Sequence, residues 1–321
     1  MKSIPLNKSQ FYNMQSRKKL NALLFFDKAQ YSQNEYKIYC TNKGTRLVEE
    51  PKGYTLQLHK RVYKFLNQIE TPQYLFSSVK GKSHIDNAKF HNGNDYVVAL
   101  DLSKFFPKCS INYVYKFFRY KLNMSHTNAR FLSEITTIDI TKYELNPIVK
   151  KWYSIANEKL KYSVPNVHVP TGSCLSQKLA FLSYIDMFDE IYDYCNKNNI
   201  KMSVYVDDIV ISSKKRISKT FVKNILFIFS EYGQEANPKK IKYYKKGMAK
   251  KITGIYINDH KQLKAPSKQH YDIQKLRVHI DRGGNYNKIE SLIGKLRYVS
   301  MLESGKFKQL IKKYSKMKNT E

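Results

Sequence analysis

The sequence predicts a mixed α+β fold in which an antiparallel sheet carries carboxylates and helices complete the chain. Residues 203–212 contain two short apolar runs around Asp207 and Asp208, a pattern that predicts a tight β-hairpin with both carboxylates at its tip. Residues 96–102 are apolar except for Asp101, which is typical of a buried strand. After residue 266, apolar side chains recur at helical spacing. Together these observations place strands in the middle of the chain and helices at its end.

The composition points to a polyanionic partner. The 321 residues include 57 Lys and Arg against 26 Asp and Glu, for a formal net charge of +31. Such a field attracts nucleic acid. Biased codon usage would explain the many lysines, but not the scarcity of acidic residues.

Cysteine usage and the N-terminus predict a cytoplasmic protein without a membrane partner. The cysteines form no C-x-x-C pair and lack zinc-ligand spacing, which is typical of reduced thiols. Residues 1–10 lack the apolar core of a signal peptide, and the apolar run 22–26 is too short to span a bilayer. The four cysteines are Cys40, Cys109, Cys174 and Cys195.

The first elements are a helix over 16–29, strands over 36–39 and 45–48, and a helix over 54–69. The turn between the two strands is basic. Its residues Lys43 and Arg46 would suit a triphosphate, although such charges are more often a solvated surface. Arg46 is the better candidate, because a guanidinium binds phosphate through two hydrogen bonds.

Two helices are expected between the strand 96–102 and the hairpin 203–212. Pro107 ends the strand, and Ser110 is the predicted N-cap of the first helix. The segment 123–165 shows only one clear helical stretch, near 131–138. The loop 170–177 then opens a long helix, and its small residues would allow close approach of a phosphate or a base.

The remaining elements are a helix over 218–232, single strands over 241–244 and 250–257, and three C-terminal helices. The C-terminal helices are predicted over 267–283, 287–302 and 307–317. The last one carries a basic polar face, which predicts a helical bundle lying along a nucleic-acid backbone. A solvated surface would explain the same charges equally well. The basic side chains at issue include Lys308, Lys312 and Lys313.

The three carboxylates suggest metal-assisted nucleotidyl transfer. If the strand 96–102 lies beside the hairpin, Asp101, Asp207 and Asp208 converge on a spot that would hold two Mg²⁺ ions about 4 Å apart. One ion would activate a 3′ or 2′ hydroxyl, and the other would hold the triphosphate. Lys240 is placed to protonate the leaving pyrophosphate or to stabilise its charge, with a structural lysine as the alternative. The plain alternative for the carboxylate pair is an exposed turn.

In their order and spacing, these residues resemble the motifs of reverse transcriptases. Two further elements are similar to those of retron reverse transcriptases in particular: Asn-Ala-x-x-His at 87–91 and a Val-Thr-Gly-like triplet at 252–254. The matching positions are Asp101 with Phe105 and Phe106, Pro170 with Gly172 and Ser176, Tyr205 with Asp207 and Asp208, Asn237 with Lys239 and Lys240, and Gly294 with Leu296 and Tyr298.

The resemblance implies a right-hand polymerase with fingers, an antiparallel-sheet palm backed by helices, and a helical thumb. Residues 1–91 would hold an N-terminal helix, the fingers and the Asn-Ala-x-x-His region. Residues 92–112 and 166–260 would form the palm, with a fingers insertion at 113–165. Residues 261–321 would form the thumb, a basic helical RNA-binding bundle.

The resemblance also implies an activity. The chain would copy a structured noncoding RNA into DNA from deoxynucleoside triphosphates, starting at the 2′-hydroxyl of an internal guanosine. The product would be a branched RNA–DNA hybrid, the multicopy single-stranded DNA, made with a retron effector protein in a phage-defence system. No RNase H domain is recognised, so a host RNase H would remove the template.

Site residues follow from the matching positions. Asp101, Asp207, Asp208 and the backbone carbonyl of Leu102 would bind the two Mg²⁺ ions, and Phe106, beside Phe105, would exclude a ribose 2′-hydroxyl. The resemblance places Thr171 and Gly172 beside the incoming nucleotide, although Thr171 replaces a usual Gln, Gln177 a usual Pro, and Val206 a more frequent Ala. These changes bear on fidelity and nucleotide affinity. RNA recognition is expected at Asn87, Ala88, His91, Ile252, Thr253, Gly254 and the C-terminal lysines.

Two alternatives belong beside this interpretation. Among other bacterial reverse transcriptases, a group II intron maturase is disfavoured because no splicing or endonuclease domain is recognised after the expected thumb, and a diversity-generating enzyme is disfavoured by the two retron-like elements. An RNA-binding scaffold or antitoxin with a vestigial polymerase site is disfavoured because all three carboxylates are present.

Overall fold

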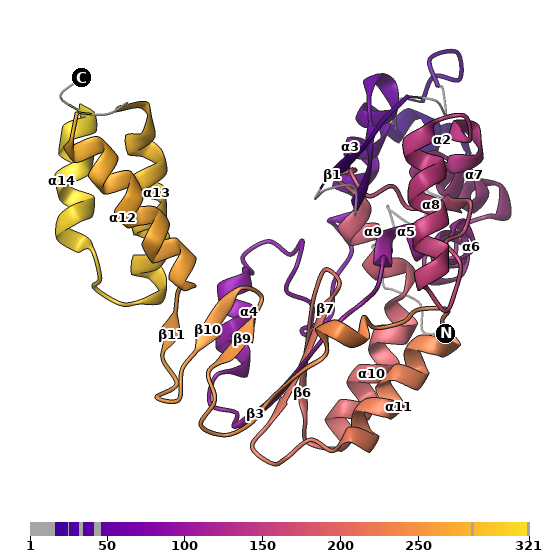
Figure 1. The fold of residues 1–321 in the computed structure, drawn as a ribbon. Coiled ribbons are helices and arrows are strands. Elements are labelled where there is room, and N and C mark those ends of the chain that lie inside the picture. The colour runs from indigo at the N-terminus through magenta and orange to yellow at the C-terminus, as the bar shows by residue number, and fades with distance from the viewer. Residues whose placement is uncertain (1–16, 25, 32–34, 42–45, 284–285, 320–321) are drawn as a thin grey trace.

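A four-stranded antiparallel sheet lies at the centre of the molecule, between an N-terminal group of helices and a C-terminal three-helix unit (Figure 1). The computed structural model describes residues 17–24, 26–31, 35–41, 46–283 and 286–319. The strand order is β6-β7-β3-β8. Its strands are β3 (Tyr96–Asp101), β6 (Lys201–Tyr205), β7 (Asp208–Ser213) and β8 (Lys242–Tyr244).

Alternate residues of the central sheet enter two different cores, as the period of a strand requires. Val98 and Ile211 pack into the larger core, together with side chains of α9 (Ser176–Ser183), α10 (Ile185–Lys197) and α11 (Lys219–Glu231). Val97 and Val210 face the other way, into a core shared with α4 (His84–His91) and the C-terminal helices. The sheet is therefore covered on both faces, and a functional site would lie at the ends of its strands.

The N-terminal helices cover one end of the sheet and carry a hairpin of their own (Figure 1). This hairpin pairs β1 (Tyr36–Thr41) with β2 (Arg46–Pro51). The predicted helix 16–29 is shorter in the structure, and the predicted turn 42–44 lies outside the described residues. The other elements here are α2 (Arg17–Leu24), α3 (Gly53–Leu66), α5 (Phe105–Lys108), α6 (Ile111–Lys116), the π-helix η1 (Phe117–Lys121), α7 (His126–Thr136), β4 (Ile138–Asp139), the 3-10 helix η2 (Ile140–Tyr143), α8 (Pro147–Lys159) and β5 (Val167–His168).

Two predicted elements are divided in the structure. The strand predicted over 250–257 is a hairpin of β9 (Lys250–Ile252) and β10 (Ile255–Ile257), because Thr253 and Gly254 adopt φ of 43° and 86° and turn the chain back. With β11 (Leu263–Lys264) this hairpin forms a three-stranded sheet. The long helix predicted after residue 176 breaks at Tyr184, which separates α9 from α10.

The C-terminal unit contains α12 (Ser267–Asp281), the 3-10 turn η4 (Tyr286–Lys288), α13 (Ile289–Leu302) and α14 (Lys308–Asn319). Its apolar side chains, including Leu292, Leu296 and Tyr314, are buried against one another. The three predicted C-terminal helices are therefore confirmed, with α14 starting one residue later than expected. Within the described ranges, no helix has the length and apolar character needed to cross a membrane.

Candidate active site

The tip of the β6–β7 hairpin and the end of β3 bring the three predicted carboxylates together. Asp208 is the first residue of β7 and pairs in register with Asp101, the last residue of β3. Val206, expected in a strand, adopts a φ of 61° and forms the turn that precedes Asp207. The amide of Leu102 donates a hydrogen bond of 2.9 Å to the carbonyl oxygen of Asp207, which fixes the tip against β3.

The carboxylates are held close enough together to oppose one another's ionisation. Burial raises the pKa of Asp207, and the nearby charge of Asp101 raises it further. Burial, followed by the charges of Asp207 and Asp101, raises the pKa of Asp208 to about 6. Such a cluster stores electrostatic repulsion that a bound cation would relieve.

Lys240 neutralises part of this charge. Its ammonium donates hydrogen bonds of 2.8 and 2.9 Å to the two carboxylate oxygens of Asp101. These bonds, and then the negative charge of Asp101, raise the pKa of Lys240. The short turn η3 (Pro238–Lys240) positions the side chain, because the Asn237 amide donates to the Asp101 carbonyl at 2.8 Å. Lys240 therefore retains its proton and acts on the site as a fixed positive charge.

The donor set fits Mg²⁺ that is completed by a substrate. In the part of the chain that the structure describes, no three His, Cys, Asp or Glu side chains are grouped so that they alone would hold a metal ion. Mg²⁺ in polymerase sites is commonly bound by one or two carboxylates together with substrate phosphates and water. Asp207 and Asp208 are hard oxygen donors with raised pKa values, which is the chemistry that such an ion requires.

A hollow of about 160 Å³ lies next to the carboxylates. Asp101, Asp208 and Lys240 line one part of it, and Thr253 and Gly254 line another. The hydroxyl of Thr253 also donates to the carbonyl of His84 at 3.1 Å, so the β9–β10 turn is tied to α4. The structure therefore joins the two retron-like elements to each other and brings one of them to the carboxylates.

The predicted nucleotide-binding residues lie in different environments. Arg46 is exposed at the start of β2, and its charge lowers the pKa of Asp207 against the larger effect of burial. Phe105 is buried, whereas Phe106 is half-buried. Lys43 lies outside the described residues. Arg46 is thus a basic residue of β2 whose charge acts on the carboxylates.

The loop with Thr171 and Gly172 packs directly on β2. The Thr171 hydroxyl donates to the carbonyl of Leu47 at 2.8 Å, so this side chain is directed to the strand. A Cβ on Gly172 would meet the Glu49 carbonyl oxygen and the Val48 side chain at 2.9 Å each. Glycine is therefore required at this position by the close approach of two backbones.

The Asn-Ala-x-x-His element is internal in the structure. Asn87, Ala88 and His91 are fully buried, and the His91 ring nitrogens lie 2.7 Å from the hydroxyls of Ser203 and Ser212. Burial lowers the pKa of His91 to about 3. The expectation that these three side chains contact RNA is not met in this conformation, because no surface of them is exposed. Of the three, His91 fastens α4 to the β6–β7 hairpin, whereas the buried side-chain amide of Asn87 has no hydrogen-bond partner among the described residues.

The other predicted RNA-binding residues differ in exposure. Ile252 is fully buried and Thr253 half-buried, whereas Gly254 is exposed at the turn. Lys308 and Lys312 are exposed on α14. Lys313 is exposed as well, but its ammonium forms an ion pair of 2.9 Å with Asp281. Lys308 and Lys312 are thus the better placed of the three lysines for a phosphate backbone.

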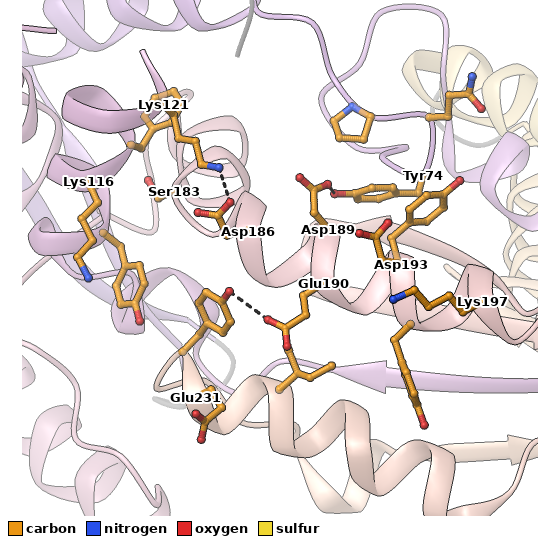
Figure 2. Close-up of a pocket in the computed structure, with 18 residues that line it drawn as sticks. Tyr74, Lys116, Lys121, Ser183, Asp186, Asp189, Glu190, Asp193, Lys197 and Glu231 are labelled. Carbon is orange, nitrogen blue, oxygen red and sulfur yellow. Dashed lines mark hydrogen bonds and ion pairs between the residues drawn. The ribbon is translucent and has the colours of Figure 1, made fainter. Parts of the chain in front are cut away.

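A larger cleft, of about 1020 Å³, lies on the helical side of the sheet between α6, α10 and α11 (Figure 2). Acidic residues of α10 and several tyrosines line it, and Tyr232 donates a hydrogen bond to Glu190 across it. None of the residues predicted from the sequence lines this cleft, and the carboxylates of the candidate site are absent from its lining. The volume of a cleft therefore does not identify the candidate active site in this molecule.

Sequence reasoning missed three residues of the site region. Lys251, next to the predicted triplet, lines the hollow with Asp208. Glu49 and His168 form a buried pair behind the Thr171 loop. The position of Lys251 beside the triplet was a usable signal, but nothing in the sequence connects Glu49 with His168.

Comparison with known proteins supports the same class. The family model described as reverse transcriptase (RNA-dependent DNA polymerase) matches residues 38–271. The chain is 26% identical over 289 residues to the retron Ec83 reverse transcriptase of Escherichia coli, covering 87% of this chain and 86% of that protein. It is 22% identical over 289 residues to the retron Ec86 reverse transcriptase of Escherichia coli, covering 88% and 81%. A solved apo telomerase from Candida tropicalis shows 13% identity and a TM-score of 0.48, with 72% of this chain and 54% of that chain covered.

The chain therefore belongs to the reverse transcriptase family and is an RNA-directed DNA polymerase, an activity for which the family uses divalent metal ions. The predicted similarity to retron enzymes is confirmed by these relatives.

Proposed function

We propose that this polymerase is of the retron type. It would reverse transcribe a structured noncoding RNA, starting from an internal 2′-hydroxyl, and produce a branched RNA–DNA hybrid, the multicopy single-stranded DNA. The observation that carries this proposal is the position of the β9–β10 turn. Thr253 and Gly254 line the same hollow as Asp101 and Asp208, so an element typical of retron enzymes lies where a primer or template strand would meet the chemistry.

The proposed right-hand arrangement assigns the central sheet to the palm, with the boundaries 92–112 and 166–260. The N-terminal residues 1–91 and the insertion 113–165 would be fingers, and residues 261–321 would be the thumb. In this arrangement the β1–β2 hairpin and the C-terminal helices lie on opposite sides of the sheet, as Figure 1 shows. A nucleic-acid duplex would lie between them, attracted by the net charge of +31.

Asp101, Asp207, Asp208 and the carbonyl of Leu102 would hold two Mg²⁺ ions. When bound, these ions would lower the pKa of the attacking hydroxyl and neutralise charge on the triphosphate and the leaving pyrophosphate. The protein itself has little covalent chemistry to do, because positioning and charge stabilisation dominate phosphoryl transfer.

The remaining site residues would position and stabilise the nucleotide. Arg46 would bind the triphosphate, and Phe106 would exclude a 2′-hydroxyl at the sugar. Lys240 would stabilise negative charge and not serve as the proton donor, because its raised pKa makes it a weak acid. Recognition of the RNA would come mainly from its shape and its backbone, with Lys308 and Lys312 exposed on α14 as cations for the backbone.

A phage-defence role would require partners beyond the substrate. A retron effector protein would act together with the enzyme and its DNA product, and a host RNase H would remove the template RNA. An RNA-binding scaffold with an inactive polymerase site is the competing function, and it differs in one measurable respect. A scaffold would carry RNA without DNA.

The test is to purify the protein from cells carrying its native locus, digest the bound nucleic acid with RNase, and separate the remainder on a denaturing gel. We expect a discrete short DNA with the wild type and none with Asp207→Asn combined with Asp208→Asn. Glu70→Gln is the matched control, because it removes an exposed carboxylate charge without changing shape. Debranching enzyme should shift the band if the DNA is joined to RNA through a 2′-hydroxyl.

Bound RNA without DNA in the wild type would favour the scaffold function. DNA of many lengths and sequences would contradict the retron type, while leaving the polymerase activity intact.

A further inference from the structure

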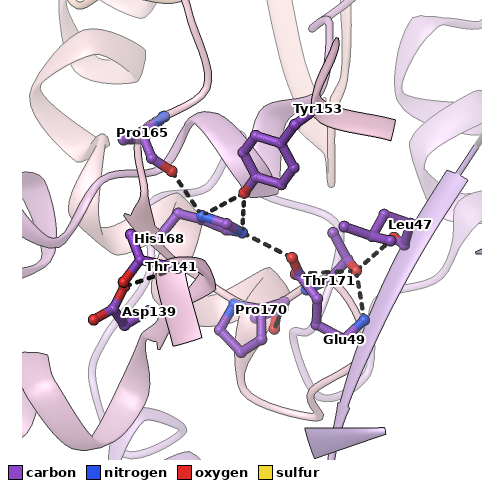
Figure 3. Close-up of polar contacts among 10 residues, drawn as sticks. Leu47, Glu49, Asp139, Thr141, Tyr153, Pro165, His168, Pro170 and Thr171 are labelled. Atoms are coloured by element: carbon purple, nitrogen blue, oxygen red, sulfur yellow. Dashed lines mark hydrogen bonds and ion pairs between the residues drawn. The ribbon is translucent and has the colours of Figure 1, made fainter. Parts of the chain in front are cut away.

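Glu49 is a fully buried carboxylate at the junction between β2 and the Thr171 loop (Figure 3). One of its oxygens accepts a hydrogen bond of 3.0 Å from the Thr171 amide. Its other oxygen lies 2.9 Å from Nε2 of His168, which is also fully buried. A buried carboxylate with such partners is well compensated, and removal of any partner would leave a charge without a counterpart.

Backbone groups extend this contact into a continuous clamp. The Glu49 amide donates to the Thr171 hydroxyl at 3.1 Å, and that hydroxyl donates to the Leu47 carbonyl at 2.8 Å. The Gly172 amide donates to the Glu49 carbonyl at 3.1 Å. Three hydrogen bonds and a glycine without room for a side chain therefore hold the loop at one fixed position on β2.

His168 anchors the clamp to the rest of the fold. Its Nδ1 lies 2.9 Å from the carbonyl oxygen of Pro165, and the Tyr153 hydroxyl lies 3.3 Å from the same nitrogen (Figure 3). Both ring nitrogens thus lie within hydrogen-bond distance of oxygen atoms, so the imidazole is held on both sides. β5, which carries His168, also pairs with β4, so the anchor does not depend on β2.

β2 connects this clamp to the catalytic carboxylates. Arg46 stands three residues before Glu49 on the same strand, and its charge acts on Asp207. Because β2 is held at Glu49, the clamp fixes the backbone position of Arg46 and the position of the Thr171–Gly172 loop together. These are the two protein segments expected to meet one nucleotide from different sides.

We propose that Glu49 and His168 are positioning residues for the incoming deoxynucleoside triphosphate. The pair keeps Arg46 and the Thr171–Gly172 loop in a single geometry, so that both contact the same nucleotide. The inference rests on the proposed nucleotide-binding role of Arg46 and of that loop. It does not depend on which RNA is copied or on how synthesis is primed.

The proposal predicts a specific kinetic change. Asp101, Asp207 and Asp208 are carried by β3, β7 and the turn before it, so loosening the clamp leaves them in place. The bound nucleotide would still react at saturating concentration, but it would be bound more weakly and less selectively. KM for the nucleotide should rise while kcat stays nearly constant, a separation that general unfolding would not produce.

The experiment measures single-nucleotide incorporation on an RNA template with a DNA primer, at saturating Mg²⁺ and varied nucleotide. Glu49→Gln preserves shape and removes the charge, and we expect KM to rise about tenfold, the effect of the nucleotide losing one hydrogen bond to a displaced Arg46 or loop. We expect kcat to remain within about twofold of the wild type and misincorporation to increase. Glu50→Gln is the matched control on the same strand, since Glu50 is half-exposed and is paired with the exposed Lys52 at 2.7 Å. It should match the wild type.

Thr171→Val provides a second, milder variant. It removes one hydroxyl with its bonds to Glu49 and Leu47, while Glu49 and His168 remain paired, so folding is expected to be retained. A smaller rise in KM in the same direction would support the clamp. An unchanged KM in both variants would overturn the proposal, and so would a fall in kcat that parallels a lower active fraction. Wild-type synthesis on this template, together with failure on the native RNA, would instead contradict the proposed retron function alone.

Discussion

Glu49 on one side, and Asp207 with Asp208 on the other, are carboxylates withdrawn from solvent to different degrees, and the fold treats their charges in opposite ways. Glu49 is fully buried, yet His168 and the Thr171 amide compensate its charge. Asp207 and Asp208 are only half-buried, but neither forms an ion pair in the described structure, and both have raised pKa values. The fold thus satisfies the acid that holds a loop and leaves unsatisfied the acids that are to receive a cation. Compensation, and not depth of burial, separates Glu49 from Asp207 and Asp208, whereas Asp101 is paired with Lys240.

The largest expected difference between the two groups is in catalysis. Asp207→Asn and Asp208→Asn should each reduce primer extension by about 10³-fold or more, because each removes charge that holds the cation. Glu49→Gln should retain most of its activity at saturating nucleotide. Primer extension at fixed Mg²⁺ with saturating nucleotide compares the variants directly. Comparable losses of primer extension in all three variants would show that Glu49 does not differ from Asp207 and Asp208 in its effect on catalysis.

The next difference is in stability, because substitutions in the two groups should change the free energy of unfolding in opposite directions. Glu49→Ala should lower the free energy of unfolding by about 3–5 kcal/mol, because it leaves His168 and the Thr171 amide without their partner. Asp208→Asn should raise it by about 1–2 kcal/mol at pH 8 without divalent cations, after allowance for solvent screening. Urea denaturation followed by circular dichroism would measure both. A loss of stability in Asp208→Asn would show that this carboxylate supports the fold.

The third difference depends on pH. The folded-state pKa of Asp208, about 6, lies above its unfolded value, so the native state binds the proton more tightly between these two values. The gain from Asp208→Asn should therefore be absent near pH 3.5, grow as the pH rises to about 6, and stay constant above it. Affinity for Mg²⁺ should rise over the same interval, because protons compete with the ion. Thermal melting with and without Mg²⁺ across this range would test both, and a gain already present at pH 3.5 would exclude this origin.

The smallest expected effect concerns Arg46, which shares β2 with Glu49 and whose charge acts on Asp207. Arg46→Lys keeps a positive charge near Asp207 but loses the two-pronged contact with phosphate, so KM for the nucleotide should rise about three- to tenfold with little change in kcat. Steady-state incorporation would measure this change. Lys219→Arg, at an exposed position at the start of α11, is a suitable control for a Lys–Arg exchange away from the site. A loss confined to kcat would place Arg46 at the chemical step instead.

The sequence was sufficient to predict that Asp101, Asp207 and Asp208 lie together, because their surroundings are local. An apolar strand that ends in Asp101, and a hairpin with two acids at its tip, each define a short segment, and their pairing needed only that the strands be neighbours. The clamp was not accessible in this way. Glu49 and Glu50 are adjacent acids on one strand, and only the fold shows that Glu49 faces inward, toward a histidine 119 residues away.

Local turn chemistry explains the other differences between expectation and structure. Thr253 carries a positive φ of 43°, which a threonine rarely adopts, so the sequence 250–257 looked like one strand. The Asn-Ala-x-x-His element was recognised as a motif, but a motif does not state its exposure. Packing against the sheet made Asn87 and His91 internal.

The two hydrogen bonds of His91 have a consequence for how the catalytic hairpin can fail. Ser203 and Ser212 belong to β6 and β7, and a single imidazole bridges their hydroxyls. A slip of one residue between these strands would turn the side chains to the opposite face, and it would carry Asp208 away from Asp101. The imidazole resists such a slip, because only one alignment puts both hydroxyls within its reach. His91 thus fixes the register of the hairpin, so the alignment of Asp207 and Asp208 at the tip depends on a contact made farther back along both strands.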